Sequence, residues 1–338
     1  KRGWPSIGWV LGGPGAGTTK FGAYLRLASL TQSTRVSAWG YGDAGLPCGS
    51  RVIFGTQFPY GLLMGRLWAG TADPDVVVVW GANPGESQPL NLMRPIMDAK
   101  AKGARLVVID PRFTVTASKA DAYLGVRPGT DSALALGLMH VIFQKDLHDV
   151  PFILRHSTGP YLVRNDTGKY LRGKDLGLAA EQEYVVWDTR TSEPAPRGAA
   201  GAAPALEGAY TVNGIACKTA FELLKELCAA YTPQKTSEIT GVASDLIIGL
   251  AKRVGSAREA TFVTHMGFTR TFHGDISLRA LGTVATVTGN VMATFKGGYL
   301  PAVLNWKPFL KAVPDKPSYT RMGILQLYDA IISGNPYP

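Results

Sequence analysis

The chain has 338 residues, of which 46% are hydrophobic, which is enough to bury sizeable cores and excludes a disordered or fibrous protein. Lys and Arg outnumber Asp and Glu by 35 to 25, so the net charge of +10 favours an anionic ligand or partner. The basic residues are scattered, with no run of five or six and no aromatic ladder between them, which argues against nucleic acid as that partner. No apolar stretch approaches the roughly 20 residues that a membrane-spanning helix requires.

Two kinds of segment alternate along the chain. Short apolar runs end at glycine- or proline-rich turns, as buried strands of parallel sheets do, and longer segments carry apolar residues at helical spacing. Strands are expected at residues 7–11, 76–80, 105–109, 122–126 and 261–264, and helices at residues 21–30, 88–102, 132–144, 220–231, 243–254 and 278–288. This alternation predicts the α/β class, with doubly wound, Rossmann-like domains and mostly parallel sheets.

Residues 159–217 interrupt this alternation. They are rich in Gly, Pro, Ala and charged residues, with short strand-like pieces at residues 184–187 and 210–212. We expect an irregular excursion here rather than a further domain.

A glycine-rich turn follows the first expected strand, at residues 12–20. Backbone N–H groups before a helix can bind phosphate, but a phosphate loop requires lysine at the position that Thr18 occupies. The dinucleotide fingerprint G-x-G-x-x-G is not matched either, which argues against a nicotinamide or flavin dehydrogenase. We therefore expect a tight strand-to-helix turn.

Three strand ends carry a stronger joint signal, at residues 80–87, 109–114 and 127–131. Ligands of open α/β sheets bind just beyond the carboxyl ends of the strands, where all three segments fall. Glycines there let the backbone approach a phosphate, and amide, hydroxyl and carboxylate side chains can bind a sugar or a base. Each segment alone is also compatible with a well-capped turn, but together they predict a nucleotide site.

The order of these motifs resembles the dimethyl sulfoxide reductase family of molybdopterin enzymes. The matching patterns are W-G-x-N-P-x-E-S at residues 80–87, I-D-P-R-x-T at residues 109–114 and A-D-x-x-L-x-x-R-P-G-T-D at residues 120–131. Residues 265–274, the T-G-N of residues 288–290 with the glycines at 297 and 298, and G-x-P-Y-P at residues 334–338 resemble later motifs of that family. The resemblance runs from about residue 40 to the end.

The resemblance implies two doubly wound α/β domains, one inserted in the other. Residues 1–45 and 258–338 would form a discontinuous domain, part of the pterin-binding core, and residues 46–257 an inserted domain that binds a guanine dinucleotide end of the cofactor. The family's amino-terminal cysteine-rich region and carboxy-terminal barrel are missing. Both ends of the chain therefore read as cuts in a longer polypeptide, since it lacks an initial Met and stops in a turn-like sequence.

The same resemblance supplies the candidate cofactor-binding residues, which lie in the strand-end motifs. They are Trp80, Gly81, Asn83, Glu86, Ser87, Ile109, Asp110, Pro111, Arg112, Thr114, Gly129, Thr130, Asp131, Met266, Gly267 and Arg270.

Family members commonly bind the metal through a side chain about thirty residues before the W-G-x-N motif. Cys48 lies 32 positions before Trp80, and a thiolate is a soft ligand suited to Mo or W, so Cys48 is the first candidate. Asp43, in the same loop, is the alternative. His265 and His273 are candidates for relaying protons.

The implied protein is the catalytic-subunit core of a molybdenum or tungsten bis-(molybdopterin guanine dinucleotide) oxidoreductase. It would catalyse two-electron redox chemistry or oxygen-atom transfer on a small-molecule substrate. A [4Fe–4S] cluster is expected in the missing amino-terminal region or in a partner subunit, because the three cysteines of this chain form no C-x-x-C pair.

The expected partner is an iron–sulfur electron-transfer subunit, with any membrane attachment made through partner subunits, in the periplasm or cytoplasm of a prokaryote. Two alternatives stay open. One is a non-catalytic homologue that serves as a structural subunit of an electron-transfer complex. The other is a non-redox relative, a hydratase or a transhydroxylase.

Overall fold

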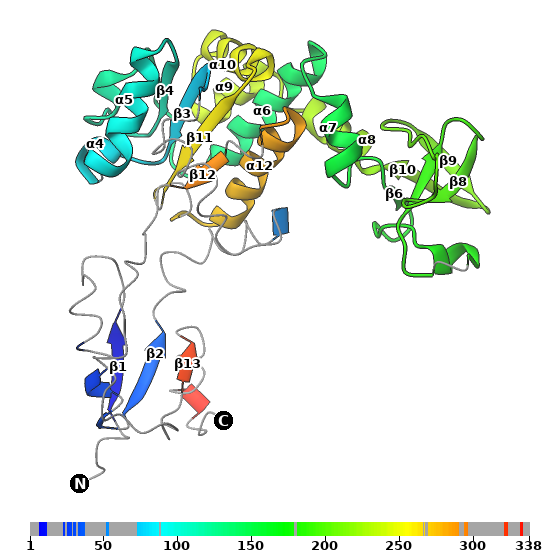
Figure 1. Ribbon diagram of the computed structural model, residues 1–338, viewed down its shortest axis with the longest axis horizontal. Helices are drawn as coiled ribbons and strands as arrows, with labels where there is room; N and C mark the ends of the chain where they lie inside the picture. Colours follow the sequence, from blue (N-terminus) through cyan, green and yellow to red (C-terminus); the bar gives the residue numbers. More distant parts are fainter. Residues whose placement is uncertain are drawn as a thin grey trace.

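The computed structural model describes residues 7–11, 23, 26–28, 30–31, 33–37, 52–53, 73–87, 89–178, 181–265, 267, 270–290, 294–296, 321–323 and 332–333. Its centre is a five-stranded sheet in which every pair of neighbours is parallel. The spatial order is β12 (Thr294–Lys296), β11 (Ala260–Thr264), β3 (Val76–Trp80), β4 (Arg105–Ile109) and β5 (Ala122–Leu124). Figure 1 labels the first four of these strands.

This order confirms the doubly wound α/β prediction. In chain order, β3, β4 and β5 lie successively outward from the middle of the sheet, and β11 and β12 then follow on the other side of β3. The direction of winding therefore reverses between β3 and β11. In doubly wound sheets that reversal is the place where ligands bind.

Strand β3 shows why the sheet is buried on both faces. All five of its residues are inaccessible to solvent. Because side chains alternate along a strand, Val76, Val78 and Trp80 join one core and Val77 and Val79 the other. Because helices cover both faces of the sheet, this strand has no solvent-facing positions at which polar residues would alternate with apolar ones, as the sequence predicted.

Helices cover both faces of this sheet. On one face pack α6 (Asp131–Gln144), α10 (Ser244–Ser256) and α12 (Gly274–Val287), joined by α8 (Ala220–Ala229) and α9 (Pro233–Thr240). On the other face lie α4 (Pro84–Ser87), the π-helical turn η4 (Pro89–Met93) and α5 (Arg94–Ala101). Short 3-10 turns also occur, at η5 (Ala117–Lys119) and η6 (Gly173–Leu176).

The single helix expected over residues 88–102 is divided. Prolines at 84, 89 and 95 stand at or near the start of α4, η4 and α5. Proline lacks the N–H that continues a helix, so each one favours a new start.

Residues 159–217 are more regular than expected. They form an antiparallel sheet of β6 (Leu162–Arg164), β10 (Ile215–Thr219) and β9 (Ala209–Val212), and a hairpin of β7 (Val185–Asp188) and β8 (Glu193–Pro196). A small core of their own supports them, made of Leu162, Leu171, Val185, Val212 and Cys217. We call residues 159–219 the excursion. In Figure 1 it lies apart from the five-stranded sheet, beyond α7 (Val150–His156) and α8.

Strands from near the two ends of the chain meet in a further, three-stranded sheet. Strand β2 (Thr34–Ser37) pairs in parallel with both β1 (Gly8–Leu11) and β13 (Arg321–Gly323). Strands β11 and β12 pair within the sheet of β3. The interior of any sheet can accommodate a fully buried strand, so the sequence of β11 did not specify the sheet to which it belongs. The two-domain division of the whole chain stays a prediction.

No helix among the described residues has both the length and the apolar character needed to cross a membrane.

Candidate nucleotide site at the carboxyl edge of the sheet

Two glycines meet where the winding of the sheet reverses. Gly81 follows β3 and has a φ of +64°, a conformation that favours glycine, and Gly267 lies just beyond β11. A Cβ added to Gly267 would lie 2.7 Å from the carbonyl oxygen of Gly81. The two backbones are therefore in contact, and no side chain fits between them.

Asn83 stands next to this contact. Its Oδ1 accepts a hydrogen bond of 2.7 Å from the Thr116 hydroxyl, which in turn accepts from the Gly85 N–H at 2.9 Å. These bonds fix the orientation of the amide, so that Nδ2 is its donor side. Nδ2 is buried and has no hydrogen-bond partner among the described residues. Buried donors are rarely left unsatisfied, so this atom marks a place where a ligand could accept a hydrogen bond.

The end of β4 carries a partly buried carboxylate. Asp110 Oδ1 accepts from the Arg112 N–H at 2.9 Å, and the Tyr123 hydroxyl donates to the Asp110 carbonyl at 2.9 Å. Burial raises the pKa of Asp110, and the Arg112 N–H and positive charge oppose that rise. The Arg112 guanidinium lies 3.5 Å from the Glu86 carboxylate; both side chains are mostly exposed, so this pair contributes little stability.

The loop between β5 and α6 is held by its own bonds. Gly129 has a φ of +80°, and the Thr130 hydroxyl donates to the Arg127 carbonyl at 2.8 Å. The Arg127 guanidinium donates to the carbonyls of Glu238 and Ile239 in the last turn of α9. Arg127 is thus engaged in capping a helix, where a cation is stabilising.

Asp131, the first residue of α6, is bonded to the end of β3. Trp80 Nε1 donates to its Oδ1 at 2.7 Å, and both side chains are buried. Burial raises the pKa of Asp131, while the Trp80 N–H and the backbone N–H groups of Asp131 and Gly129 oppose the rise. With these donors around it, the carboxylate ties two strand-end loops together.

The segment after β11 lies beside the loop before α6. A Cβ on Gly129 would be 3.9 Å from Cβ of Thr271, whose hydroxyl oxygen is buried and has no hydrogen-bond partner among the described residues. His273 precedes α12 with a φ of +59°, and its ring lies 3.9 Å from that of the exposed Phe272. His265 directly follows β11, and Arg270 is exposed between the two histidines.

Other expected residues have local structural contacts. The Ser87 hydroxyl donates to the Asn83 carbonyl, and the buried Thr114 hydroxyl accepts from the Ala117 N–H. Ile109 is buried in the core, and Pro111 is exposed. Sequence reasoning missed Thr116, Thr271 and Tyr123, because a threonine or tyrosine in a loop gives no signal until its neighbours are known.

Cys48, Asp43 and Met266 lie outside the described residues. Within those residues, no cluster of three or more His, Cys, Asp or Glu side chains could hold a metal ion. Cys217 and Cys228 are buried, which fits packing roles, and burial raises the pKa of Cys228 to about 12.

Comparison with known proteins gives one family. The molybdopterin oxidoreductase family profile matches residues 19–307. The chain is 32% identical over 218 residues to the putative dimethyl sulfoxide reductase catalytic subunit of Halobacterium salinarum, covering 64% of this chain and 26% of that protein. It is 30% identical over 261 residues to dimethyl sulfoxide reductase DmsA of Escherichia coli, covering 74% and 26%.

The alpha subunit of perchlorate reductase from Dechloromonas aromatica is 29% identical over 288 residues, covering 72% of this chain and 31% of that protein. The chain thus spans about a quarter to a third of the length of these relatives. Among solved structures, acetylene hydratase from Pelobacter acetylenicus aligns with 80% of this chain and 28% of its own, at 21% identity and a TM-score of 0.47, too low to support a conclusion.

Proposed function

Because the chain belongs to the molybdopterin oxidoreductase family, we propose that the carboxyl edge of its five-stranded sheet binds the nucleotide end of a molybdopterin guanine dinucleotide. The observation that carries the proposal is the contact of Gly81 with Gly267, at the position where winding reverses. Backbone without side chains at that position gives a phosphate-bearing ligand close access.

The residues present fit such a group. Asn83 Nδ2 and the Thr271 hydroxyl are buried polar groups without a partner among the described residues, and a nucleotide diphosphate offers acceptor oxygens to both. The backbone N–H groups that open α6 also favour an anion, because they stand at the positive end of the helix dipole.

Individual roles follow from these contacts. Asp110 directly follows β4, the second strand of this sheet in chain order, the position from which an acidic residue binds ribose hydroxyls in dinucleotide folds. Gly129 and Thr130 would present backbone to the ligand. Asp131 and Trp80, already bonded to each other, would hold this loop against β3 and act as positioning residues.

The full catalytic subunit would use this cofactor for two-electron redox chemistry, with or without oxygen-atom transfer, at molybdenum or tungsten. Cys48, or alternatively Asp43, would supply the protein ligand to the metal, and Met266, Gly267 and Arg270 would lie nearer the pterin. His265 and His273 would hold or transfer substrate protons. We also propose an iron–sulfur electron-transfer subunit as the partner, with a [4Fe–4S] cluster either in that subunit or in a region of the catalytic polypeptide outside this chain.

The test compares cofactor content in the full-length protein. Asn83→Asp keeps an acceptor for Thr116 but replaces the unpaired donor with a negative oxygen, and Gly267→Ala places a methyl group against the Gly81 carbonyl. Each should lower molybdenum or tungsten and extractable guanine nucleotide on the order of tenfold or more. The control is Gly249→Ala, because a Cβ there meets nothing within 4 Å.

Wild-type protein with neither metal nor guanine nucleotide would contradict the proposal and favour the non-catalytic structural homologue. Unchanged cofactor content in both variants, with the control also unchanged, would place the nucleotide elsewhere.

A further inference from the structure

The excursion holds a column of two tyrosines with a guanidinium at each end. The Tyr161 and Tyr184 rings stack at 4.5 Å with 20° between their planes. The Arg172 guanidinium lies 3.6 Å from the centre of the Tyr184 ring, and the Arg197 guanidinium lies 5.5 Å from that of Tyr161. Since two groups cannot cover the same face of one ring, the order is Arg172, Tyr184, Tyr161, Arg197.

Backbone contacts fix both ends of this tyrosine–arginine column. Arg172 donates to the Gln182 carbonyl at 2.6 Å, and Arg197 donates to the Arg155 carbonyl at 3.2 Å. A guanidinium has five N–H donors, so most of those on each arginine stay available. The stacking and the carbonyl bonds hold both groups in place before any partner arrives.

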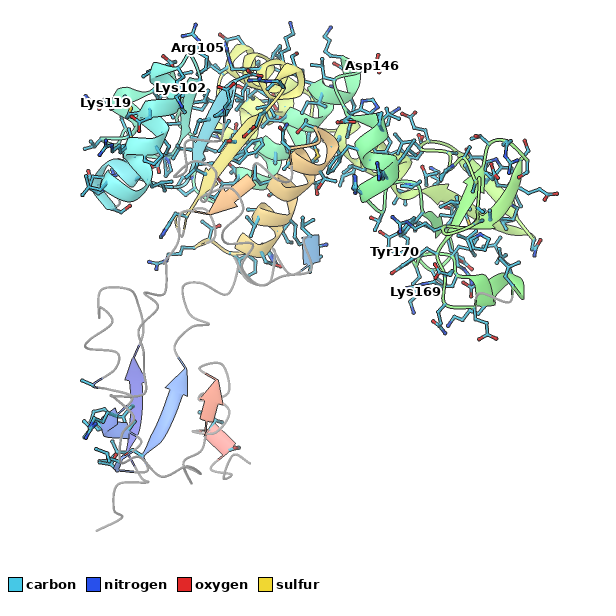
Figure 2. The ribbon with its side chains drawn as sticks, viewed as in Figure 1. Lys102, Arg105, Lys119, Asp146, Lys169 and Tyr170 are labelled. Carbon is cyan, nitrogen blue, oxygen red and sulfur yellow. The ribbon has the colours of Figure 1, made fainter. Side chains whose placement is uncertain are left out.

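The two arginines differ from three other cations of the excursion. Arg164, Arg190 and Lys218 each lie within 4.0 Å of a carboxylate. Among the described residues, neither Arg172 nor Arg197 forms such an ion pair. Burial raises the pKa of Tyr161; the Arg197 charge opposes that rise and the Glu183 charge adds to it. Lys169, exposed beside Tyr170, adds a further positive charge at the margin of the excursion (Figure 2).

We infer that this column is a docking site for carboxylate side chains of an acidic protein partner, namely another subunit of the complete enzyme. Guanidinium groups bind carboxylates through two parallel hydrogen bonds, and stacked guanidinium groups lose little freedom in doing so. Arginine and tyrosine are also the residues that most often dominate protein interfaces.

The geometry favours protein over nucleic acid. Single-stranded nucleic acids are bound by stacking bases on free aromatic faces. Here each face of Tyr161 and Tyr184 is already covered by the other tyrosine or by an arginine. The inference does not require the proposed nucleotide site, because the column belongs to the excursion and not to the carboxyl edge of the five-stranded sheet.

The experiment uses the full-length protein purified with its natural partner subunits. Arg172→Glu with Arg197→Glu should weaken partner binding about 100-fold, measured by sedimentation velocity over a dilution series. Arg172→Lys with Arg197→Lys keeps the charge but not the planar fork, and should weaken it about tenfold. Lys252→Glu with Arg253→Glu, two exposed positions on α10, is the charge-matched control.

A fluorescent ten-residue Glu-rich peptide gives a second readout, since it should bind wild-type protein and the control but not the double glutamate variant. Metal and guanine-nucleotide content should stay unchanged in all variants, which separates this inference from the proposed function. Partner affinity within about threefold of wild type in the double glutamate variant would overturn the inference, and so would an equal loss of affinity in the control. Purification of the protein without any partner subunit, or binding of RNA or anionic vesicles in place of the peptide, would also overturn it.

Discussion

The five-stranded sheet and the excursion use their polar groups in opposite ways. At the carboxyl edge of the sheet, Asn83 and Thr271 each keep a buried polar atom without a partner among the described residues. In the excursion, Arg164 is paired with Asp166 and Asp175, whereas the partly exposed Arg172 lies over the Tyr184 ring and the exposed Arg197 over the buried Tyr161 ring. The first arrangement suits a small ligand that enters the protein, and the second suits a partner that lies against it.

The hydrophobic cores of the two regions also differ, in a way that suits these two kinds of partner. Strand β3 is buried along its whole length between helices, whereas β9 alternates between exposed and covered residues and has only a small core beneath it. A sheet covered on both faces holds its strand ends rigidly, which a multi-contact site requires. A sheet with one open face can present side chains to another protein.

The largest expected effect is a loss of stability from a substitution at the centre of the large core. Phe262 in β11 is completely buried, so Phe262→Ala should lower the free energy of unfolding by about 3–5 kcal/mol. Denaturant unfolding would measure the loss. A loss below about 1 kcal/mol would mean that β11 is not tightly packed against β3.

A matched change in the excursion should have a smaller and local effect. Leu171 is completely buried in the separate small core, and Leu171→Ala should remove roughly 2–4 kcal/mol there. Hydrogen exchange should rise across residues 159–219 and stay unchanged in β3 and β4. Increased exchange throughout the five-stranded sheet would show that the two regions unfold as one unit.

The smallest expected effect tests the Trp80–Asp131 hydrogen bond. Trp80→Phe leaves a buried carboxylate without its indole donor and should lower stability by about 1.5–3 kcal/mol. Adding Asp131→Asn should recover part of that loss, because a neutral amide is less costly to bury.

The effect of Trp80→Phe should depend on pH. Burial already raises the pKa of Asp131, so the native state binds this proton more tightly than the unfolded chain does, and stability falls as the pH rises from the unfolded pKa to the folded one. Losing the indole donor raises the folded pKa further, so the loss of stability should be larger near pH 7 than near pH 4. Equal losses at both values, measured by thermal unfolding, would contradict an ionised Asp131.

Much of this arrangement was predictable from local patterns. The run at residues 76–80 predicted a buried parallel strand, and the following glycines predicted backbone close to a ligand. The pairing partners were not predictable in the same way. Trp80 and Asp131 were both expected to contact the cofactor, but they are bonded to each other across 51 positions of sequence. The contact of Thr116 with this site could be recognised only from the tertiary structure, in which the turn after β4 places it beside Asn83.

The sequence by itself determined the α/β class, the strand ends that carry polar chemistry and the family to which the chain belongs, because these depend on short-range periodicity and on ordered motifs. Only the tertiary structure decided that β11 lies next to β3, that Gly81 touches Gly267, and that two arginines enclose a pair of tyrosines. Such contacts join residues distant in sequence. Any buried strand satisfies the same hydrophobic pattern, and the choice among partners is made by packing and backbone hydrogen bonding in three dimensions.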